Sequence, residues 1–441
     1  MEAREVLSLE AVEVKESSLV VAEVRRLIYS EEERFSTDAD DIVTYLADAG
    51  DVDKILAIVK PRSMEELEGL IGMANRSGTA LYTPMPFGLE PRRPGIIVDQ
   101  SLMDRVWSLD PKRLFAVVEP GVTWEQLLPQ VEALGLRMAL PAAARNHSVL
   151  GTYQEKDIVL MSSRYTNKQI SNLHTLLADG RDYKSGSHAN PSAESNYINW
   201  REDGGPNISR LILGSHNMFG LSYKGFVYLY PYFEARKVTV LGFSDMRSAL
   251  KAAQFISRRE MAVECLALNQ AKAEAVTDAK VGAPWVTVAA LEGSADLVEY
   301  YRKRIEDELG STNELSELAP AFEKALRSPW DAPDGTVGFY TLFSKVEEFD
   351  PIVGADAPRM VIPVKRGASV YNHYELPKRP GMGTFEKLLD AGAFFSSPTG
   401  SLAHAMYERT GNYAGLVEIA KRRMDPHGIM NPDQVIQGGD E

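Results

Sequence analysis

The sequence contains a single cysteine, Cys265, among 441 residues. One thiol excludes an intramolecular disulfide and a metal site built from several cysteines, and no metal site is expected. The apolar surroundings of Cys265, AVECLALN, favour a small core residue over a reactive thiol. The sequence also lacks an apolar run of transmembrane length, and its first residues, MEAREVLSLEAVEVKESS, have no signal-peptide pattern. These absences predict a cytoplasmic protein without a transmembrane segment.

Basic residues are scarce relative to acidic ones. Lys and Arg number 48 against 62 Asp and Glu, which gives a formal net charge of −14. Residues 1–53 hold 5 of the basic and 15 of the acidic side chains, a net charge of −10. A chain of this sign repels a phosphate backbone, so we expect no nucleic-acid partner. The acidic front segment could dock a partner, but a solvated surface is the favoured interpretation.

The length of the chain predicts two or three domains. Strand, helix and strand patterns over residues 55–83 indicate a βαβ unit, with a strand over residues 96–99 pairing alongside. Pro231 follows an alternating strand and suggests a boundary. We therefore predict an α+β fold with a first domain over residues 1–233 (subdomains about 1–100 and 101–233). Residues 234–385 would form a second domain, a mainly antiparallel sheet with helices on one face, and residues 386–441 a helical return to the first.

The stretch from Gly95 to Gly135 carries the clearest local signals. Residues 96–98 and 114–118 are β-branched or apolar runs typical of buried strands. Pro120-Gly121 predicts a tight turn, because proline fixes φ and glycine tolerates positive φ. Thr123 is a suitable N-cap for a helix whose apolar residues recur at helical spacing, and Gly135 is a suitable C′ residue.

Part of that stretch, VVEPGVTWEQL (residues 117–127), resembles the FAD enzymes of the vanillyl-alcohol oxidase and p-cresol methylhydroxylase family. Further segments are similar to successive family segments in the same order: SVLG at 148–151, LLADGRDYKSG at 176–186, GPNISRLILGSHNMFGLSYKGFVYLYP at 205–231 and AKRRMDPHGIMNP at 420–432. The resemblance implies a PCMH-type FAD-binding domain of two subdomains, a substrate (cap) domain, and FAD as the cofactor. No histidine of this chain aligns with a covalent flavin link, so bound FAD is expected to be non-covalent.

The resemblance also implies where the cofactor would be contacted. The implied cofactor-binding residues are Pro86, Phe87, Gly88, Arg145, Ser148, Leu150, Gly151, Thr152, His216 and Asn217. This chain departs from the family in its glycine-rich loops: PMPFGLEPRRP at 84–94 retains only Gly88, and Pro84 lacks the N–H donor that a phosphate would use. Arg92, Arg93 or Arg145 could replace the lost donors, although solvated loop arginines are the favoured interpretation.

The family's catalytic pattern is also altered. The position of an assisting aspartate falls at Pro141-Ala142, and a tyrosine–arginine pair falls near Phe394-Phe395, so ordinary phenol oxidation is expected to be impaired. The remaining candidates are His373 as a general base, Tyr371 on the same face of its strand, and Arg409. A structural role for His373 is the competing interpretation.

Two functions follow from these observations. One is an FAD-dependent oxidoreductase that oxidises a small hydroxylated or aromatic substrate by hydride transfer to flavin. The alternative is a flavin-lacking, non-catalytic homologue that serves as a structural or regulatory subunit beside an active paralogue. A third, weaker idea is that the vacated cleft binds another ligand between apolar walls such as Trp124, Phe87 and Phe394. The implied partners are a small-molecule substrate and a redox partner or paralogous subunit, in a homo- or hetero-oligomer.

Overall fold

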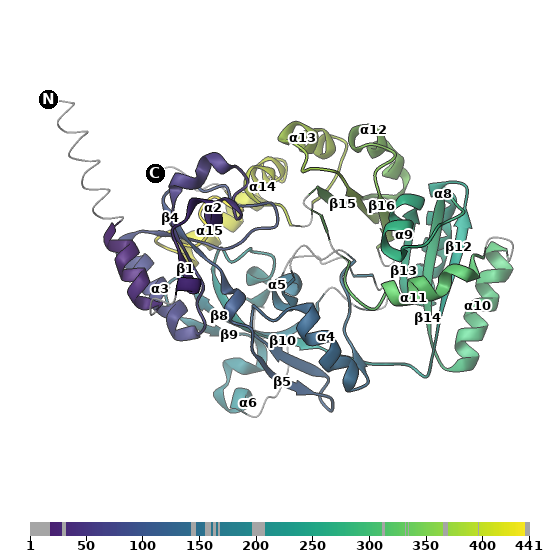
Figure 1. Ribbon diagram of the computed structural model, residues 1–441, viewed down its shortest axis with the longest axis horizontal. Helices are drawn as coiled ribbons and strands as arrows, with labels where there is room; N and C mark the ends of the chain where they lie inside the picture. Colours follow the sequence, from purple (N-terminus) through teal and green to yellow (C-terminus); the bar gives the residue numbers. More distant parts are fainter. Residues whose placement is uncertain are drawn as a thin grey trace.

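The computed structural model describes residues 18–28, 32–142, 147–154, 160–161, 165, 168–195, 208–310, 314–330, 332–333, 335–364, 369–395 and 397–436. These residues form an α+β fold with a four-stranded, a five-stranded and a six-stranded sheet and a two-stranded ribbon. Figure 1 shows the six-stranded sheet on one side of the molecule and the other sheets on the opposite side. No helix within the described ranges is long and apolar enough to cross a membrane.

The four-stranded sheet contains the predicted βαβ unit. Its strands, in the order β1-β2-β4-β3, are β1 (Phe35–Ser36), β2 (Ile55–Val59), β4 (Gly95–Val98) and β3 (Ala80–Tyr82). The strand expected alongside the unit, β4, lies between its two strands and is parallel to both. Ile96 and Val98 pack toward helix α3 (Met64–Ser77), while Ile97 packs on the opposite face with Ile42 of α2 (Ala39–Val43). Both faces are buried, as expected for parallel strands.

The five-stranded sheet is antiparallel and contains two strands of the Gly95–Gly135 stretch, β5 and β6. Its strands, in the order β5-β6-β10-β8-β9, are β5 (Val106–Asp110), β6 (Phe115–Val118), β10 (Gly220–Tyr228), β8 (Ile170–Leu177) and β9 (Asp182–Lys184). Helices α4 (Trp124–Ala133) and α5 (Val149–Gln154) pack on one face. The predicted cap is present, because Thr123 accepts a hydrogen bond from the Gln126 amide, and Gly135 has φ +70°.

Short elements connect this sheet to the rest of the chain. Strand β7 (Leu136–Arg137) pairs with β11 (Tyr230–Pro231) to form the ribbon. Helices α6 (Pro191–Ser195) and α7 (Ser209–Ile212) precede β10 in the sequence.

The six-stranded sheet, which we call the cap sheet, is antiparallel and has helices on both faces. Its order is β12-β14-β13-β16-β17-β15, with β12 (Ala235–Phe243), β13 (Ala262–Asn269), β14 (Trp285–Gly293), β15 (Thr336–Leu342), β16 (Arg359–Pro363) and β17 (Ser369–Glu375). Helices α8 (Met246–Arg258) and α10 (Ala295–Leu309) pack on one face, and α9 (Gln270–Thr277) and α11 (Ala319–Ala325) on the other. The expectation of helices on one face was wrong, because the central strands carry apolar side chains on both faces.

The last part of the chain packs back on the first strands. After α12 (Asp350–Val353), helices α13 (Met382–Asp390), α14 (Gly400–Tyr407) and α15 (Tyr413–Met424) follow, and Figure 1 shows α14 and α15 on the side of the molecule that holds the first strands. The turn after α15 is fixed by Asp425, which accepts hydrogen bonds from the amides of Ile429 and Met430 and pairs with Lys421. Leu81 of β3 then exchanges backbone hydrogen bonds with Ile429 and Asn431.

Cys265 occupies the core position that its neighbours predicted. It is fully buried on β13, and its thiol lies 3.4 Å from the carbonyl oxygen of Ala253. Burial raises the pKa of this thiol to about 12, which keeps it protonated and unreactive at neutral pH.

Gly121 provides a test of the turn that begins α4. A Cβ atom added there would lie 2.3 Å from the carbonyl oxygen of Ser101, which is backbone and cannot rotate away. We expect Gly121→Ala to lower the free energy of unfolding by about 1–3 kcal/mol, as overpacking does. Chemical denaturation measures this change. Gly383→Ala is the matched control, because a Cβ there meets open space, and an equal loss in both variants would contradict the assignment.

Candidate functional site

A cavity of about 430 Å³ opens at the carboxyl ends of the parallel strands β3 and β4. Ligands of open parallel sheets bind at this kind of edge. The cavity, which we call the cleft, lies between the four-stranded sheet and the helices of the five-stranded sheet. It is lined by Tyr45, Thr83, Pro84, Met85, Pro86, Val98, Asp99, Gln100, Ser101, Pro120, Gly121, Thr123, His147, Ser148, Gly151, Gln154, Ile212, His216 and Asn217.

The first residues of α4 and α5 form one wall of the cleft. Thr123 and Ser148, which precede the two helices, face each other in an isolated β-bridge. The Ser148 hydroxyl accepts a hydrogen bond from the Gly151 amide at 2.9 Å and donates one to the carbonyl oxygen of Pro120. The two helix starts are therefore held together by this backbone bridge and by the Ser148 side chain.

The opposite wall is the turn that contains His216 and Asn217, both in the left-handed region with φ 48° and 58°. The Asn431 side-chain amide donates to the carbonyl oxygen of His216 at 2.6 Å and to the Thr83 hydroxyl at 2.8 Å. Its carbonyl oxygen accepts from the Thr83 amide at 2.7 Å. One side chain from the C-terminal turn thus fixes two lining segments.

His216 presents a polar atom that needs a partner. Its Nε2 is buried, and no hydrogen-bond partner for this atom lies within the described part of the chain. Burial lowers the pKa of His216 to about 4, so the imidazole is neutral at pH 7. A neutral imidazole in a cleft wall can donate a hydrogen bond to a ligand or accept one from it.

The cleft lining carries little charge, and the two described loop arginines do not contribute to it. Among the lining residues that the structure describes there is no lysine or arginine, and Asp99 is the one carboxylate. Tyr45 donates to Asp99 at 2.7 Å, and burial together with this carboxylate raises the pKa of the tyrosine. Arg93 instead donates to the carbonyl oxygen of Gly428, and Arg92 is exposed and outside the lining. Neither of these two arginines reaches the cleft.

The structure brings together half of the residues implied for cofactor binding. Those that line the cleft are Pro86, Ser148, Gly151, His216 and Asn217. Arg145 lies outside the described residues. The remaining four do not line the cleft. The ring of Phe87 packs 6.3 Å from that of Phe385, and Leu150 is fully buried in the core. Thr152 accepts a hydrogen bond from Trp124 at 3.3 Å, and Gly88 forms a turn with φ +78°.

The catalytic candidates Tyr371 and His373 lie outside the cleft lining, on β17 of the cap sheet. Both are buried, and their rings are 6.2 Å apart on one face of the strand. Tyr371 shares a core cluster with Ala142, the residue at the altered aspartate position. Phe394 pairs with Tyr340 on the neighbouring strand, and the ring of Tyr340 lies 5.4 Å from that of Tyr371. The residues compared with the family's catalytic pattern therefore gather in one region.

Two further charged residues join His373, and sequence reasoning missed both. The His373 Nε2 lies 3.4 Å from a Glu375 oxygen, and Glu375 forms an ion pair with the buried Lys272 of α9. Burial acts to raise the pKa of Glu375, but the contacts with His373 and Lys272 outweigh it and lower the pKa. The i, i+2 spacing of His373 and Glu375 on one strand could have predicted that they share a face. Nothing in the sequence placed Lys272 beside them.

Arg409 is not brought to this region. Its guanidinium pairs with Asp390 at 3.0 Å and donates to the carbonyl oxygen of Ala405, and its side chain is 40% exposed. No described contact joins Arg409 to Tyr371 or His373. Within the described residues, no group of three or more His, Cys, Asp or Glu side chains could hold a metal ion.

Residues 55–184 match the family described as the FAD binding domain. The chain is 26% identical over 242 residues to the cytochrome-type mitochondrial D-lactate dehydrogenase of Arabidopsis thaliana, which covers 50% of this chain and 40% of the relative. It is 22% identical over 264 residues to the glycolate oxidase subunit GlcD of Bacillus subtilis (strain 168), covering 57% and 54%. The matches thus span about half the length of these relatives, or less.

Solved structures share the whole fold. A crystal structure of p-cresol methylhydroxylase with substrate bound superposes with a TM-score of 0.79 at 16% identity, over 97% of this chain and 98% of that one. The 4-ethylphenol oxidase of Gulosibacter chungangensis gives the same TM-score, identity and coverage. At this identity the likeness shows the fold.

The buried imidazole of His216 gives a prediction about acid stability. The pKa of histidine is about 6.5 in an unfolded chain and about 4 here. Between these values the unfolded chain takes up a proton that the folded chain excludes, so stability falls as the pH falls from about 6.5 to about 4. We expect His216→Asn to lose less stability than the unsubstituted protein between pH 7 and pH 5 in urea unfolding. The exposed His427→Asn is the control, and identical pH slopes for all three proteins would refute the prediction.

Proposed function

We propose that this chain, whose residues 55–184 belong to the FAD binding domain family and whose fold is the p-cresol methylhydroxylase type, is an FAD-dependent oxidoreductase. Its substrate would be a small hydroxylated or aromatic molecule that gives up a hydride to the flavin. The observation that supports this most directly is the cleft at the carboxyl ends of β3 and β4, which lies largely within the matched residues.

The described lining fits the uncharged parts of FAD. Its hydroxyl, amide and imidazole groups suit the ribityl chain and the polar edge of a flavin, and Gly121 and Gly151 let the backbone approach closely. The lining offers fewer partners to the pyrophosphate, because Pro84 and Pro86 have no N–H donor and no described lining residue is a lysine or an arginine. Hydroxyl and backbone donors would have to hold it.

FAD, when bound, supplies an acceptor for two electrons and a proton. His216 and Asn217 would orient the bound group, because the Asn431 contact holds their turn at the cleft. His373 would accept the substrate's hydroxyl proton at Nδ1, since its Nε2 faces Glu375. Tyr371 would orient the substrate beside it. The apolar side chains around Tyr371, including Ala142 and Met161, would exclude water from this region.

The flavin-lacking homologue is a second candidate with its own support. Two anionic phosphates beside Asp99 and without a described lining cation are costly to desolvate. A chain of this kind would keep the fold as a structural or regulatory subunit beside an active paralogue, since folds persist when sites change. A redox partner, a paralogous subunit and assembly into a homo- or hetero-oligomer belong to these proposals, as does a cytoplasmic location.

The visible spectrum of the purified protein separates the two candidates. For the oxidoreductase we expect a yellow protein, or one that becomes yellow on reconstitution with FAD, whose flavin absorption bleaches when a donor is added. Release of the flavin by acid precipitation would show that it is non-covalent. A colourless protein that takes up no FAD would instead support the flavin-lacking homologue.

His373 can be tested once a reducing substrate is identified. We expect His373→Asn to slow flavin reduction by about 10²–10⁴-fold, because that is the usual contribution of a general base, with little change in FAD affinity. Stopped-flow absorbance measures the reduction step directly. Arg247→Gln, which breaks an exposed ion pair with Glu347 in the same domain, is the control. An unchanged reduction rate in His373→Asn would remove the imidazole from the mechanism.

A further inference from the structure

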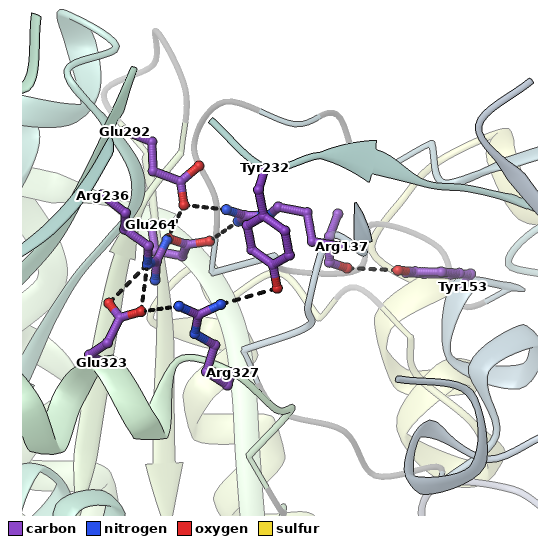
Figure 2. Close-up of polar contacts among 9 residues, drawn as sticks. Arg137, Tyr153, Tyr232, Arg236, Glu264, Glu292, Glu323 and Arg327 are labelled. Atoms are coloured by element: carbon purple, nitrogen blue, oxygen red, sulfur yellow. Dashed lines mark hydrogen bonds and ion pairs between the residues drawn. The ribbon is translucent and has the colours of Figure 1, made fainter. Parts of the chain in front are cut away.

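Six charged side chains form a balanced cluster where the cap sheet meets the rest of the molecule (Figure 2). We call the following residues the ion cluster: Arg137, Arg236, Glu264, Glu292, Glu323 and Arg327. Three guanidinium groups face three carboxylates. Arg137 bridges Glu264 and Glu292, and Arg236 contacts all three glutamates, with Glu264 at 2.9 Å.

The register of the cap sheet explains how its members come together. Arg236 of β12 lies directly opposite Glu292 of β14, and Glu264 of β13 points to the same face. Glu323 and Arg327 belong to α11 and its end, which pack on that face. Arg137 differs from the others, because it comes from β7 in the ribbon and reaches the cap sheet from outside.

Arg137 and the two glutamates that it bridges are buried, so the loss of their ion pairs would be costly. Its side chain is 8% exposed, and those of Glu264 and Glu292 are 7% and 1% exposed. Burial acts to lower the pKa of Arg137, but the combined Coulombic attraction of Glu264, Tyr165 and Glu292 outweighs it and raises the pKa. Withdrawing Arg137 from this place would leave two buried carboxylates with fewer cations, which is costly. The cluster therefore favours one position of β7 relative to the cap sheet.

The chain after Arg137 is hydrogen-bonded to a helix that lines the cleft. Two residues after Arg137, the carbonyl oxygen of Ala139 accepts a hydrogen bond from the Tyr153 hydroxyl at 2.7 Å, and Figure 2 shows Tyr153 at its right. Both groups are buried. Tyr153 lies on α5, the helix that lines the cleft with Gly151 and Gln154.

Helix α5 is also joined to the opposite wall of the cleft. The carbonyl oxygen of Gln154 accepts a hydrogen bond from the Gly214 amide at 2.7 Å, two residues before His216. Two further backbone hydrogen bonds connect the segment after Arg137 to the cap sheet. The Met161 amide donates to the carbonyl oxygen of Leu140, and the Met161 carbonyl oxygen accepts from the Cys265 amide of β13. The segment from Arg137 to Leu140 is thus attached to the cap sheet at Arg137 and, through Met161, at Leu140, and to α5 at Ala139.

We propose that Arg137 is a positioning residue that couples the seating of the cap sheet to the shape of the cofactor cleft, through the Ala139–Tyr153 hydrogen bond and α5. This inference rests on the proposed function for the identity of the ligand. Arg137 does not line the cleft, so it acts on binding through α5 rather than by contact. A cap sheet seated on the ion cluster holds α5 in place, and a cleft filled by FAD in turn favours the seated cap.

Three variants and one control test the coupling. Tyr153→Phe removes a single hydroxyl, and Arg137→Met removes the bridge to the cap sheet. The third variant combines both changes. Arg327→Met is the matched control, because Arg327 belongs to the same cluster but has a 43% exposed side chain, contacts Glu323 and Tyr232, and makes no described direct contact with β7. If Arg137→Met fails to fold, Arg137→Lys replaces it, since lysine keeps the charge but cannot bridge two carboxylates.

Two measurements are made on each protein: hydrogen exchange of the amides of residues 149–154 without FAD, and the FAD dissociation constant by flavin fluorescence. We expect each single variant to speed the exchange and to weaken FAD binding by about fivefold or more, and Arg327→Met to change neither. The double variant should bind FAD no more weakly than the weaker-binding single variant, because both changes break the same connection between the cap sheet and α5.

The outcomes separate this inference from the proposed function. Unchanged exchange over residues 149–154 in both single variants, or losses in FAD affinity that multiply in the double variant, would overturn the coupling. Unsubstituted protein that binds no FAD would overturn the proposed function alone, because the exchange measurement still decides whether Arg137 positions α5.

Discussion

The side-chain amide of Asn431 is the contact on which the cleft depends. It joins the end of β3 at Thr83 to the turn at His216, and the Asn217 side chain of that turn adds a longer hydrogen bond of 3.4 Å to the Thr83 hydroxyl. Asn431 is itself held by the turn that Asp425 organises with two backbone amides and Lys421. The amino group of Lys421 also donates to the carbonyl oxygens of Met218 and Met430. The turn after α15 therefore connects the two sheets that border the cleft.

Buried charge is distributed very unevenly in this molecule. The junction with the cap sheet holds three arginines and three glutamates, and the region of Tyr371 holds the Lys272–Glu375 pair. The described cleft lining, in contrast, is almost free of full charges. Charges at the junction cancel among themselves and fix geometry, while the cleft keeps polar groups, such as the Nε2 of His216, available for a ligand. A ligand that binds there would be recognised mainly through neutral hydrogen bonds.

Local features of the fold could be predicted from the sequence because they depend on neighbouring residues. Thr123, Pro120-Gly121 and Gly135 specify the start and end of α4, and the apolar run at residues 96–98 specifies β4. The sequence could not show that β4 inserts between β2 and β3, because strand order depends on packing at long range. Of the candidate site, Ser148, Gly151, His216 and Asn217 were found through family resemblance. The contact of Arg93 could not be predicted from the sequence, because its partner, Gly428, lies 335 residues away.

The closure of the cleft by Asn431 also constrains the order in which the protein folds. Thr83 and Asn431 are separated by 348 residues, so the contact forms only after nearly the whole chain has been synthesised. Contacts of such large sequence separation form slowly, since they require the closure of a very long loop. The two sheets can form before this contact, whereas the cleft between them is completed only after Asn431 has been synthesised. A nascent chain that has not yet reached Asn431 would hold both walls of the site but not their final spacing.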